Sequence, residues 1–169
     1  MQATGPHLSK PQAIINYFAR KKFDIICLTE IKISKVNMNF YLHKDYNTSL
    51  NLPCDHLNNS PKEGLAILIR KELYTNKTEV TSLTPGKLTK IHLDINNEDF
   101  IIYCLYAPSQ NDSVSNTFFC NFFQDITPHN NAIYIGDFNT ILDPSMDRKD
   151  PTKPYHKAKT SKTIRDHML

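Results

Sequence analysis

The chain has 169 residues, of which 40% are hydrophobic and 22% are charged, and its formal net charge is +3. A chain of this length can bury about 70% of its extended surface, and its composition excludes a disordered tail, a collagen-like repeat and a coiled coil. The longest apolar run, residues 100–107, is far shorter than the ~18 residues that a membrane span needs. We expect one domain, or at most one and a half, with no membrane association.

Cysteine usage and the first residues bear on location. The four cysteines show no C-x-x-C spacing, which favours free thiols in a reducing compartment. Residues 1–20 lack an export signal pattern. An intracellular location is expected, with the nucleus as a candidate compartment and no secretion.

The positive charge is concentrated near one end. Residues 148–169 hold seven Lys or Arg and two Asp, hence +5, while the other 13 basic and 15 acidic residues give −2. Such a segment can follow the phosphate backbone of a nucleic acid. A solvated linker or helix face explains it equally well.

The first predicted elements are a helix and a strand. Ser9 and Gln12 have the form of a capping box, which predicts a helix from residue 10. Its apolar face is expected to carry Ile14, Tyr17 and Phe18, and its last turn Lys21 and Lys22. Residues 23–29 form a short run that is mostly apolar and contains β-branched side chains, which predicts a core strand.

The middle of the chain predicts further strands. Residues 34–62 are polar and rich in Asn, which indicates a surface loop with a short element inside it. Residues 64–69 (GLAILI) predict a second buried strand. Apolar and polar residues alternate over 91–96, the period of a half-exposed strand, and Asn96-Asn97-Glu98 predicts a hairpin turn into a strand over 99–106.

The remaining elements complete a mixed α and β pattern. Residues 113–126 place Phe119, Phe122, Phe123 and Ile126 at helical spacing, which predicts a helix with a core-facing aromatic cluster. Residues 131–135 predict another buried strand, and Gly136 opens the loop after it. The order of elements predicts α+β or α/β layers.

Three predicted strands deliver polar side chains just beyond their carboxyl ends. Glu30 follows residues 23–29, Tyr106 ends the strand over 99–106, and Asp137 and Asn139 follow residues 131–135. Carboxylates without a nearby thiol or His suit a hard cation such as Mg²⁺, and an amide and a phenol can donate hydrogen bonds to phosphate oxygens. Taken singly, each of these residues is also common in a turn or on a solvated surface.

These segments, in this order, resemble the endonuclease/exonuclease/phosphatase superfamily. The resemblance rests on DIICLTE, GLAILI, LYAPS and IYIGDFNTIL with the following Asp147-Arg148, and it covers most of residues 9–148. It is nearest to the apurinic-type endonuclease domain of LINE-type retrotransposons. It implies a DNase I-like fold, a four-layered sandwich of two mixed sheets flanked by helices, incomplete here. It also implies hydrolysis of DNA phosphodiester bonds with Mg²⁺, or alternatively Mn²⁺.

The resemblance implies a role for each candidate residue. Glu30 stands where the family binds its metal, and Tyr106 where the family contacts phosphate. Asp137 matches the Asp that orients or deprotonates the attacking water, and Asn139 the Asn that helps to place it. The family's usual Q-E-T-H is T-E-I-K here, and Lys32 would repel a metal or touch substrate phosphate.

The sequence also departs from the family at both ends. Residues 1–8 lack the family's first strand and its metal-binding Asn, and the chain stops before the Asp-bearing strand and the terminal S-D-H. Arg165-Asp166-His167 lies in a polar stretch and is expected to be a solvated helix rather than that motif. We therefore expect an N-terminal segment (1–8), a partial domain (9–147) and a basic segment (148–169), with weak or absent activity.

Two other functions stay open. One is a non-catalytic remnant that binds nucleic acid through residues 148–169, and the other is a phosphatase of the same superfamily that acts on small phosphate esters. The expected partners are DNA, a divalent metal and, in a longer polyprotein, a reverse transcriptase region. A monomer is expected.

Overall fold

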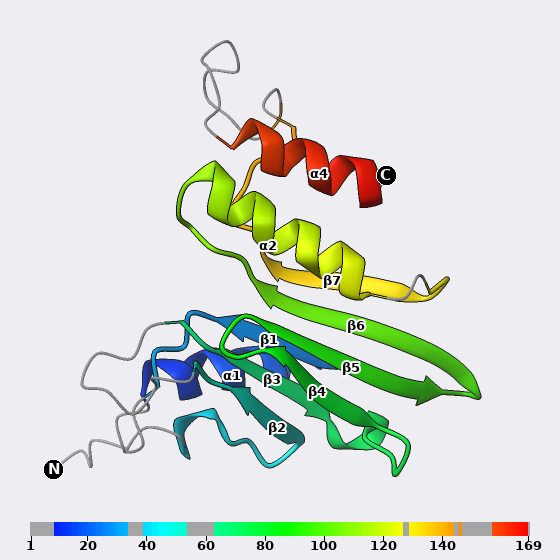
Figure 1. Cartoon of the computed structure of the whole chain (residues 1–169). Coiled ribbons are helices and arrows are strands. Elements are labelled where there is room, and N and C mark those ends of the chain that lie inside the picture. The colour runs from blue at the N-terminus through cyan, green and yellow to red at the C-terminus, as the bar shows by residue number, and fades with distance from the viewer. Residues whose placement is uncertain are drawn as a thin grey trace, which may run out of the picture. The chain divides into compact units, whose positions relative to one another are not determined.

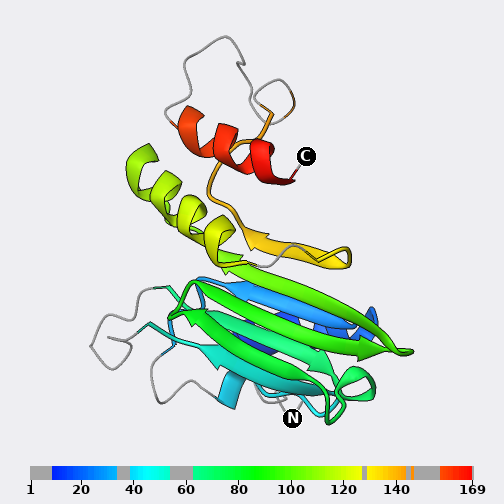
Figure 2. The same cartoon turned by 45° about the vertical axis from the view of Figure 1, so that its right-hand side comes forward.

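The computed structural model describes residues 9–33, 39–53, 63–126, 129–143, 146 and 157–168. The chain divides into two compact units, a first unit of residues 1–106 with 131–136 and a second unit of residues 107–130 with 137–169. Figures 1 and 2 show the elements of each unit from two directions. Among the described residues, no helix has the length and apolar character needed to cross a membrane.

The first unit begins with α1 (Lys10–Arg20), and its predicted capping box is present. The Ser9 hydroxyl accepts a hydrogen bond from the Gln12 N–H at 3.4 Å, and the Gln12 side chain accepts one from the Ser9 N–H at 3.3 Å. The helix ends at Arg20, two residues before the Lys22 expected in its last turn, and Lys22 already has a left-handed backbone with φ +58°.

The predicted apolar face of α1 is wrong by part of a turn. Ile15 is the buried residue of the helix, and Phe18 and Ala19 pack beside it, whereas Ile14 and Tyr17 are exposed. Residues spaced by three and four share one helix face, so the 15/18/19 stripe covers the sheet. Ile14 and Tyr17 lie to the side of that stripe.

The first sheet has the strand order β1-β3-β2, and both pairings are antiparallel. It comprises β1 (Ile25–Thr29), β2 (Tyr46–Asn51) and β3 (Leu65–Arg70). β1 and β3 confirm the predicted strands, and β2 is the short element expected inside the polar segment 34–62.

The second sheet has the order β4-β5-β6-β7. It comprises β4 (Glu79–Thr84), β5 (Leu88–Ile95), β6 (Glu98–Tyr106) and β7 (Ala132–Asp137), and a short 3₁₀ helix, η2 (Lys71–Leu73), precedes it. β4, β5 and β6 pair antiparallel. β7 runs parallel to β6, as the arrows in Figure 1 show, so this sheet is mixed.

The predicted hairpin between β5 and β6 is confirmed. Asn96 and Asn97 have φ values of +57° and +65°, the conformation of a type I′ turn, in which Asn is among the favoured residues. The Asp94 carboxylate accepts a hydrogen bond from the Asn97 N–H at 3.2 Å and stabilises the turn.

β3 explains why residues 64–69 are apolar without alternation. Its even-numbered residues Ala66 and Leu68 belong to the cluster beneath α1. Its odd-numbered residues belong to a second cluster with β5 and β6, so β3 is buried on both faces. The second cluster contains Leu65, Ile67, Ile69, Ile91, Leu93, Ile102 and Cys104.

The strand predicted over 131–135 exists as β7, but it is not buried. Ile133 is 45% exposed, because β7 is the last strand of its sheet and has only β6 as a neighbour. Tyr134 stacks on Tyr103 of β6 with ring centroids 5.4 Å apart. Gly136 has φ +136° and approaches Leu105 so closely that a Cβ atom would overlap the Leu105 carbonyl.

The second unit contains α2 (Asp112–Asp125) and α4 (Ala158–Met168), which lie side by side in both views (Figures 1 and 2). The predicted aromatic core of α2 is confirmed by Phe119 and Phe122, which are buried. In α4, Ile164 is buried, whereas residues 165–167 are exposed on a helix, as expected. The free thiols of Cys27, Cys104 and Cys120 agree with the sequence analysis.

Candidate active site

Glu30 directly follows β1, and its side chain is paired with that of Lys32. The Lys32 ammonium lies 2.8 Å from the Glu30 carboxylate, and both side chains are more than half exposed. The hydrogen bond and charge of Glu30, with a smaller contribution from Tyr106, raise the pKa of Lys32. Lys32, which departs from the family pattern, is therefore a cation held at the candidate metal ligand.

The backbone around Glu30 is left-handed at two positions. Glu30 has φ +55° and Lys32 has φ +44°, and non-glycine residues adopt such values at an energetic cost. Two hydrogen bonds hold the segment, from the Ile31 N–H to the Gly64 carbonyl at 3.3 Å and from the Lys32 N–H to the Glu63 carbonyl at 3.2 Å. The sequence of strand and loop thus fixes where the Glu30 carboxylate lies.

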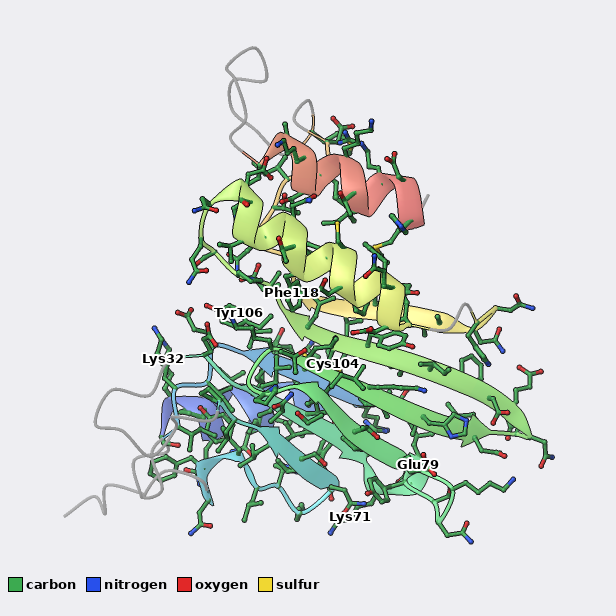
Figure 3. The ribbon with its side chains drawn as sticks, viewed as in Figure 1. Lys32, Lys71, Glu79, Cys104, Tyr106 and Phe118 are labelled. Carbon is green, nitrogen blue, oxygen red and sulfur yellow. The ribbon has the colours of Figure 1, made fainter. Side chains whose placement is uncertain are left out.

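Tyr106 ends β6 in the same unit. Its N–H donates a hydrogen bond to the Lys87 carbonyl at 2.8 Å, and the Lys87 ammonium pairs with Glu63 at 3.1 Å. Glu63 in turn adjoins the backbone that holds Lys32. Figure 3 labels Lys32 and Tyr106, which lie at the same end of the first unit. The structure therefore brings Glu30, Lys32 and Tyr106 to one end of the two sheets.

Asn51 links the two sheets near this end, and sequence reasoning missed it. Its side chain is 5% exposed, and its amide nitrogen donates to the carbonyl oxygens of Thr84 and Leu88 and to the Thr89 hydroxyl, at 2.9–3.0 Å. Its amide oxygen accepts from the Gly86 N–H at 2.7 Å. Asn51 stands in an Asn-rich segment, so composition gave no sign that this residue is a buried structural link.

Asp137 and Asn139 belong to the second unit and form one turn. The Asp137 carboxylate accepts a hydrogen bond from the Asn139 N–H at 2.8 Å, and Asn139 is left-handed with φ +47°. The Asn139 side-chain amide donates to the Ala107 carbonyl at 2.7 Å, and the Ala107 N–H donates to the Asp137 carbonyl at 2.8 Å. Asp137 remains exposed, so its carboxylate is accessible to a ligand.

Lys157 stabilises this turn through a hydrogen bond to the Asn139 carbonyl. It was not predicted as a site residue. It is 8% exposed, and its ammonium donates three hydrogen bonds, to the Pro108 carbonyl at 3.0 Å, the Ser115 hydroxyl at 2.9 Å and the Asn139 carbonyl at 2.9 Å. Burial lowers the pKa of Lys157, against the opposing effect of the Asp112 and Asp137 charges. In the sequence, Lys157 is one of the seven basic residues of the segment 148–169.

An open cavity of about 560 Å³ adjoins the turn within the second unit. Side chains and backbone of Ser109, Lys157 and residues 137–141 line it. An exposed carboxylate thus lies at an open pocket, and the Asn139 amide and the Lys157 ammonium stabilise the pocket wall through hydrogen bonds within the protein.

Glu30 is the one carboxylate predicted to bind a metal. An exposed carboxylate oxygen is a ligand that Mg²⁺ accepts together with several waters, so the donor chemistry fits. Lys32 competes for that carboxylate, and the described residues contain no cluster of three His, Cys, Asp or Glu side chains that could hold a metal ion. Asp147 and Arg148, and residues 1–8, lie outside the described residues.

Residues 7–165 match the endonuclease/exonuclease/phosphatase family, and the chain belongs to that family. The predicted superfamily is therefore confirmed. A comparison with curated protein sequences gives no match.

Three solved structures illustrate the fold. An AP endonuclease from Archaeoglobus fulgidus matches with a TM-score of 0.61 and 15% identity over 92% of this chain and 65% of its own. The endonuclease domain of TRAS1, a telomere-specific non-LTR retrotransposon, matches with a TM-score of 0.59 and 13% identity over 95% and 65%. TDP2 from Caenorhabditis elegans matches with a TM-score of 0.59 and 16% identity over 79% and 43%.

These matches confirm the predicted DNase I-like fold class, two sheets with flanking helices. The chain spans between 43% and 65% of the length of these three structures.

Proposed function

We propose that the chain is a divalent-metal-dependent phosphodiesterase domain that nicks DNA, of the kind found in retrotransposons. The turn of Asp137 and Asn139 carries this proposal. It presents an exposed carboxylate beside an open pocket, and the hydrogen bonds of Lys157 and of the Asn139 amide hold the turn in place. The names of the similar structures, an AP endonuclease and a retrotransposon endonuclease domain, support DNA as the substrate class. A reverse transcriptase region in the same polyprotein belongs to this proposal.

Each residue has a defined part in the proposed reaction. Glu30 would hold Mg²⁺, or alternatively Mn²⁺, and the bound ion would stabilise negative charge on the phosphoryl oxygens. Asp137 would accept the proton of the attacking water, because one of its oxygens is fixed by the Asn139 N–H and the carboxylate is exposed. Tyr106 would donate a hydrogen bond from its phenolic O–H to a phosphate oxygen. Asn139 would keep the turn in place through its bond to Ala107.

A nicking assay on supercoiled plasmid tests this function. We expect slow, Mg²⁺-dependent conversion to nicked circles that EDTA abolishes. Glu30→Gln and Asp137→Asn should each slow it by roughly 100-fold or more, since each removes one charged group of the proposed mechanism. Glu79→Gln and Asp125→Asn, on exposed positions of β4 and α2, are the matched controls and should retain the wild-type rate.

Three results would contradict the proposal. Nicking that survives in Asp137→Asn would show that another group, or a contaminant, does the chemistry. Absence of nicking by the wild-type chain, under conditions in which it binds DNA, would favour the non-catalytic alternative. Faster release of phosphate from small esters than nicking of DNA would favour the phosphatase alternative.

A further inference from the structure

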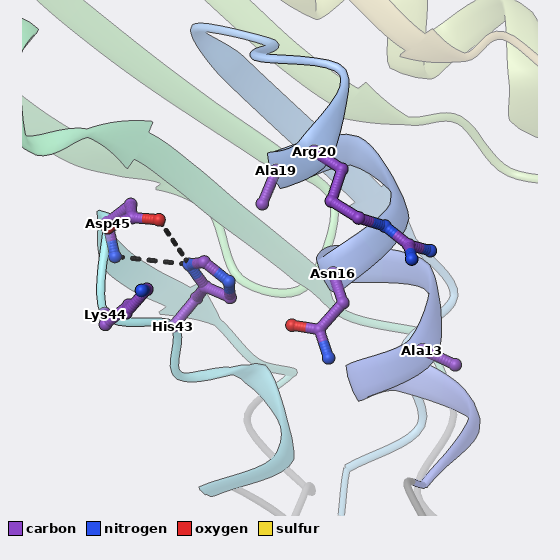
Figure 4. A pocket seen from close by; sticks show the side chains of 7 residues that line it. All are labelled: Ala13, Asn16, Ala19, Arg20, His43, Lys44 and Asp45. Carbon is purple, nitrogen blue, oxygen red and sulfur yellow. Dashed lines mark hydrogen bonds and ion pairs between the residues drawn. The ribbon is translucent and has the colours of Figure 1, made fainter.

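A basic groove lies on the first unit, at the end of the first sheet away from Glu30. Two adjoining cavities, of about 500 Å³ and 400 Å³, share Ala19, Lys44 and Asp45 in their linings. The groove comprises both cavities; its Lys and Arg residues are Arg20, Lys22, Lys44, Arg70 and Lys71, and its acidic residues are Asp45 and Glu72. Figure 4 shows the first cavity, in which Asn16 of α1 faces the imidazole of His43.

Most of these cations have no partner of opposite charge. Arg70 is paired with Asp24 at 3.7 Å, and His43 contacts Asp45. For Arg20, Lys22, Lys44 and Lys71, the described part of the chain provides no ion pair and no side-chain hydrogen bond. The negative end of α1 offsets part of this charge, because Arg20 and Lys22 lie at its carboxyl terminus.

The groove is separate from the candidate catalytic residues of the first unit. β1 begins at Ile25, next to Asp24, which pairs with the groove residue Arg70, and it ends at Thr29, next to Glu30. Five residues of strand span roughly 17 Å. A ligand in the groove therefore would not contact Glu30, although a polymer could reach both.

We propose that this groove binds the phosphate backbone of duplex DNA at a second site, which holds the polymer while another part of it reaches the catalytic residues. Unpaired Lys and Arg side chains beside the Asn16 amide and the His43 imidazole match the phosphate contacts by which proteins hold duplexes without reading sequence. The choice of DNA as ligand rests on the proposed function. The site itself rests on the charges and cavities of the groove.

Binding of a fluorescent 20-base-pair duplex, measured by anisotropy in EDTA over a series of salt concentrations, tests the groove without catalysis. The triple variant Arg20→Gln, Lys22→Gln, Lys44→Gln should bind at least about tenfold more weakly, and the slope of log K against log salt should fall by about 2.7 if all three contact phosphates. Asn16→Asp, a single change that places an acid in the groove, should weaken binding in the same direction.

The matched control is Lys10→Gln, Lys77→Gln, Lys90→Gln, which removes the same charge from positions outside both the groove and residues 148–169. It should keep the wild-type slope to within about one. An equal loss of duplex affinity in both triple variants would show that only net charge matters and would overturn the proposed binding site. An unchanged slope in the groove variant would overturn it as well. If the wild-type chain binds the duplex through the groove but does not nick plasmid, that result would count against the proposed function alone.

Discussion

The Asp137–Asn139 turn depends on a residue 18 positions further along the chain. Lys157 donates to the carbonyl of Asn139 and also to Pro108 and Ser115, which lie before and within α2. All three ammonium donors are used, which is the condition under which a buried cation is tolerated. A lysine with these contacts has no sequence signature, since the partners are two backbone carbonyls and a hydroxyl far away in the chain.

Lys157→Met should destabilise the protein by about 2–4 kcal/mol, because the Asn139 carbonyl loses its buried donor and the Pro108 carbonyl keeps only the Ser115 hydroxyl as a side-chain donor. The measurement is the urea midpoint of unfolding, with Lys159→Met, exposed on α4 directly after Lys157, as the control. The control should change stability by less than about 0.5 kcal/mol. Equal midpoints for the two variants would show that the three hydrogen bonds contribute nothing net.

The same pair of proteins tests the direction of the Lys157 pKa. Since burial lowers the pKa in the folded state, the unfolded chain binds more protons just below the ordinary lysine pKa of 10.5. The stability of the wild type relative to Lys157→Met should therefore rise with pH as the pH approaches that value from below. A relative stability that falls over this range would reverse the sign of the pKa shift.

At the scale of elements, the features that can be predicted from the sequence are those determined by neighbouring residues in the chain. The capping box of Ser9 and Gln12, the Asn96-Asn97 turn and the apolar run of β3 each have a cause within a few residues. Glu30, Tyr106, Asp137 and Asn139 are candidate site residues because each lies at or just beyond the end of an apolar strand. The chemical roles assigned to them stay predictions.

Where the prediction from sequence fails, the pairing or burial of the element depends on strands that are distant in the sequence. β4 was not predicted, because its side chains are mostly exposed and show no alternation, and pairing with β5 defines it. β7 was predicted to be buried, because its apolar composition does not reveal that it ends a sheet. Asn51 likewise acquires its role only when the turn after β4 reaches it.

The pairing of β7 with β6 requires glycine at position 136. Gly136→Ala should lower the free energy of unfolding by about 3 kcal/mol or more. The new Cβ would overlap the Leu105 carbonyl, and alanine rarely adopts a φ of +136°. Gly86→Ala is the graded comparison, with its Cβ 3.0 Å from the Pro53 nitrogen and φ +71°, and should cost less. Thermal unfolding of both variants gives the order. A smaller loss in Gly136→Ala than in Gly86→Ala would contradict the close approach of β7 to β6.

At the scale of the whole molecule, the net charge of +3 hides two basic regions with different surroundings. The groove on the first unit has unpaired, accessible cations. The basic segment 148–169 contains at least one cation, Lys157, that is buried and cannot reach a nucleic acid. Within that segment, Thr160, Ser161 and Ile164 are also buried, and Thr160 hydrogen-bonds to Asp112 of α2. Charge counted along the chain therefore overstates the binding capacity of this segment.

This arrangement changes what deletion of residues 148–169 would mean. The deletion removes α4 from α2, together with the Lys157 hydrogen bonds that hold Asn139. We expect the shortened chain to bind the dye ANS strongly and to lose more helical circular dichroism than the segment itself contributes, because the apolar surface that Ile164 covers becomes exposed. Ile164→Ala, a milder change, should cost about 2–4 kcal/mol. A shortened chain with the ANS response of the wild type would show that α2 does not need α4. Only in that case would a loss of DNA binding on deletion identify the basic segment as the binding site.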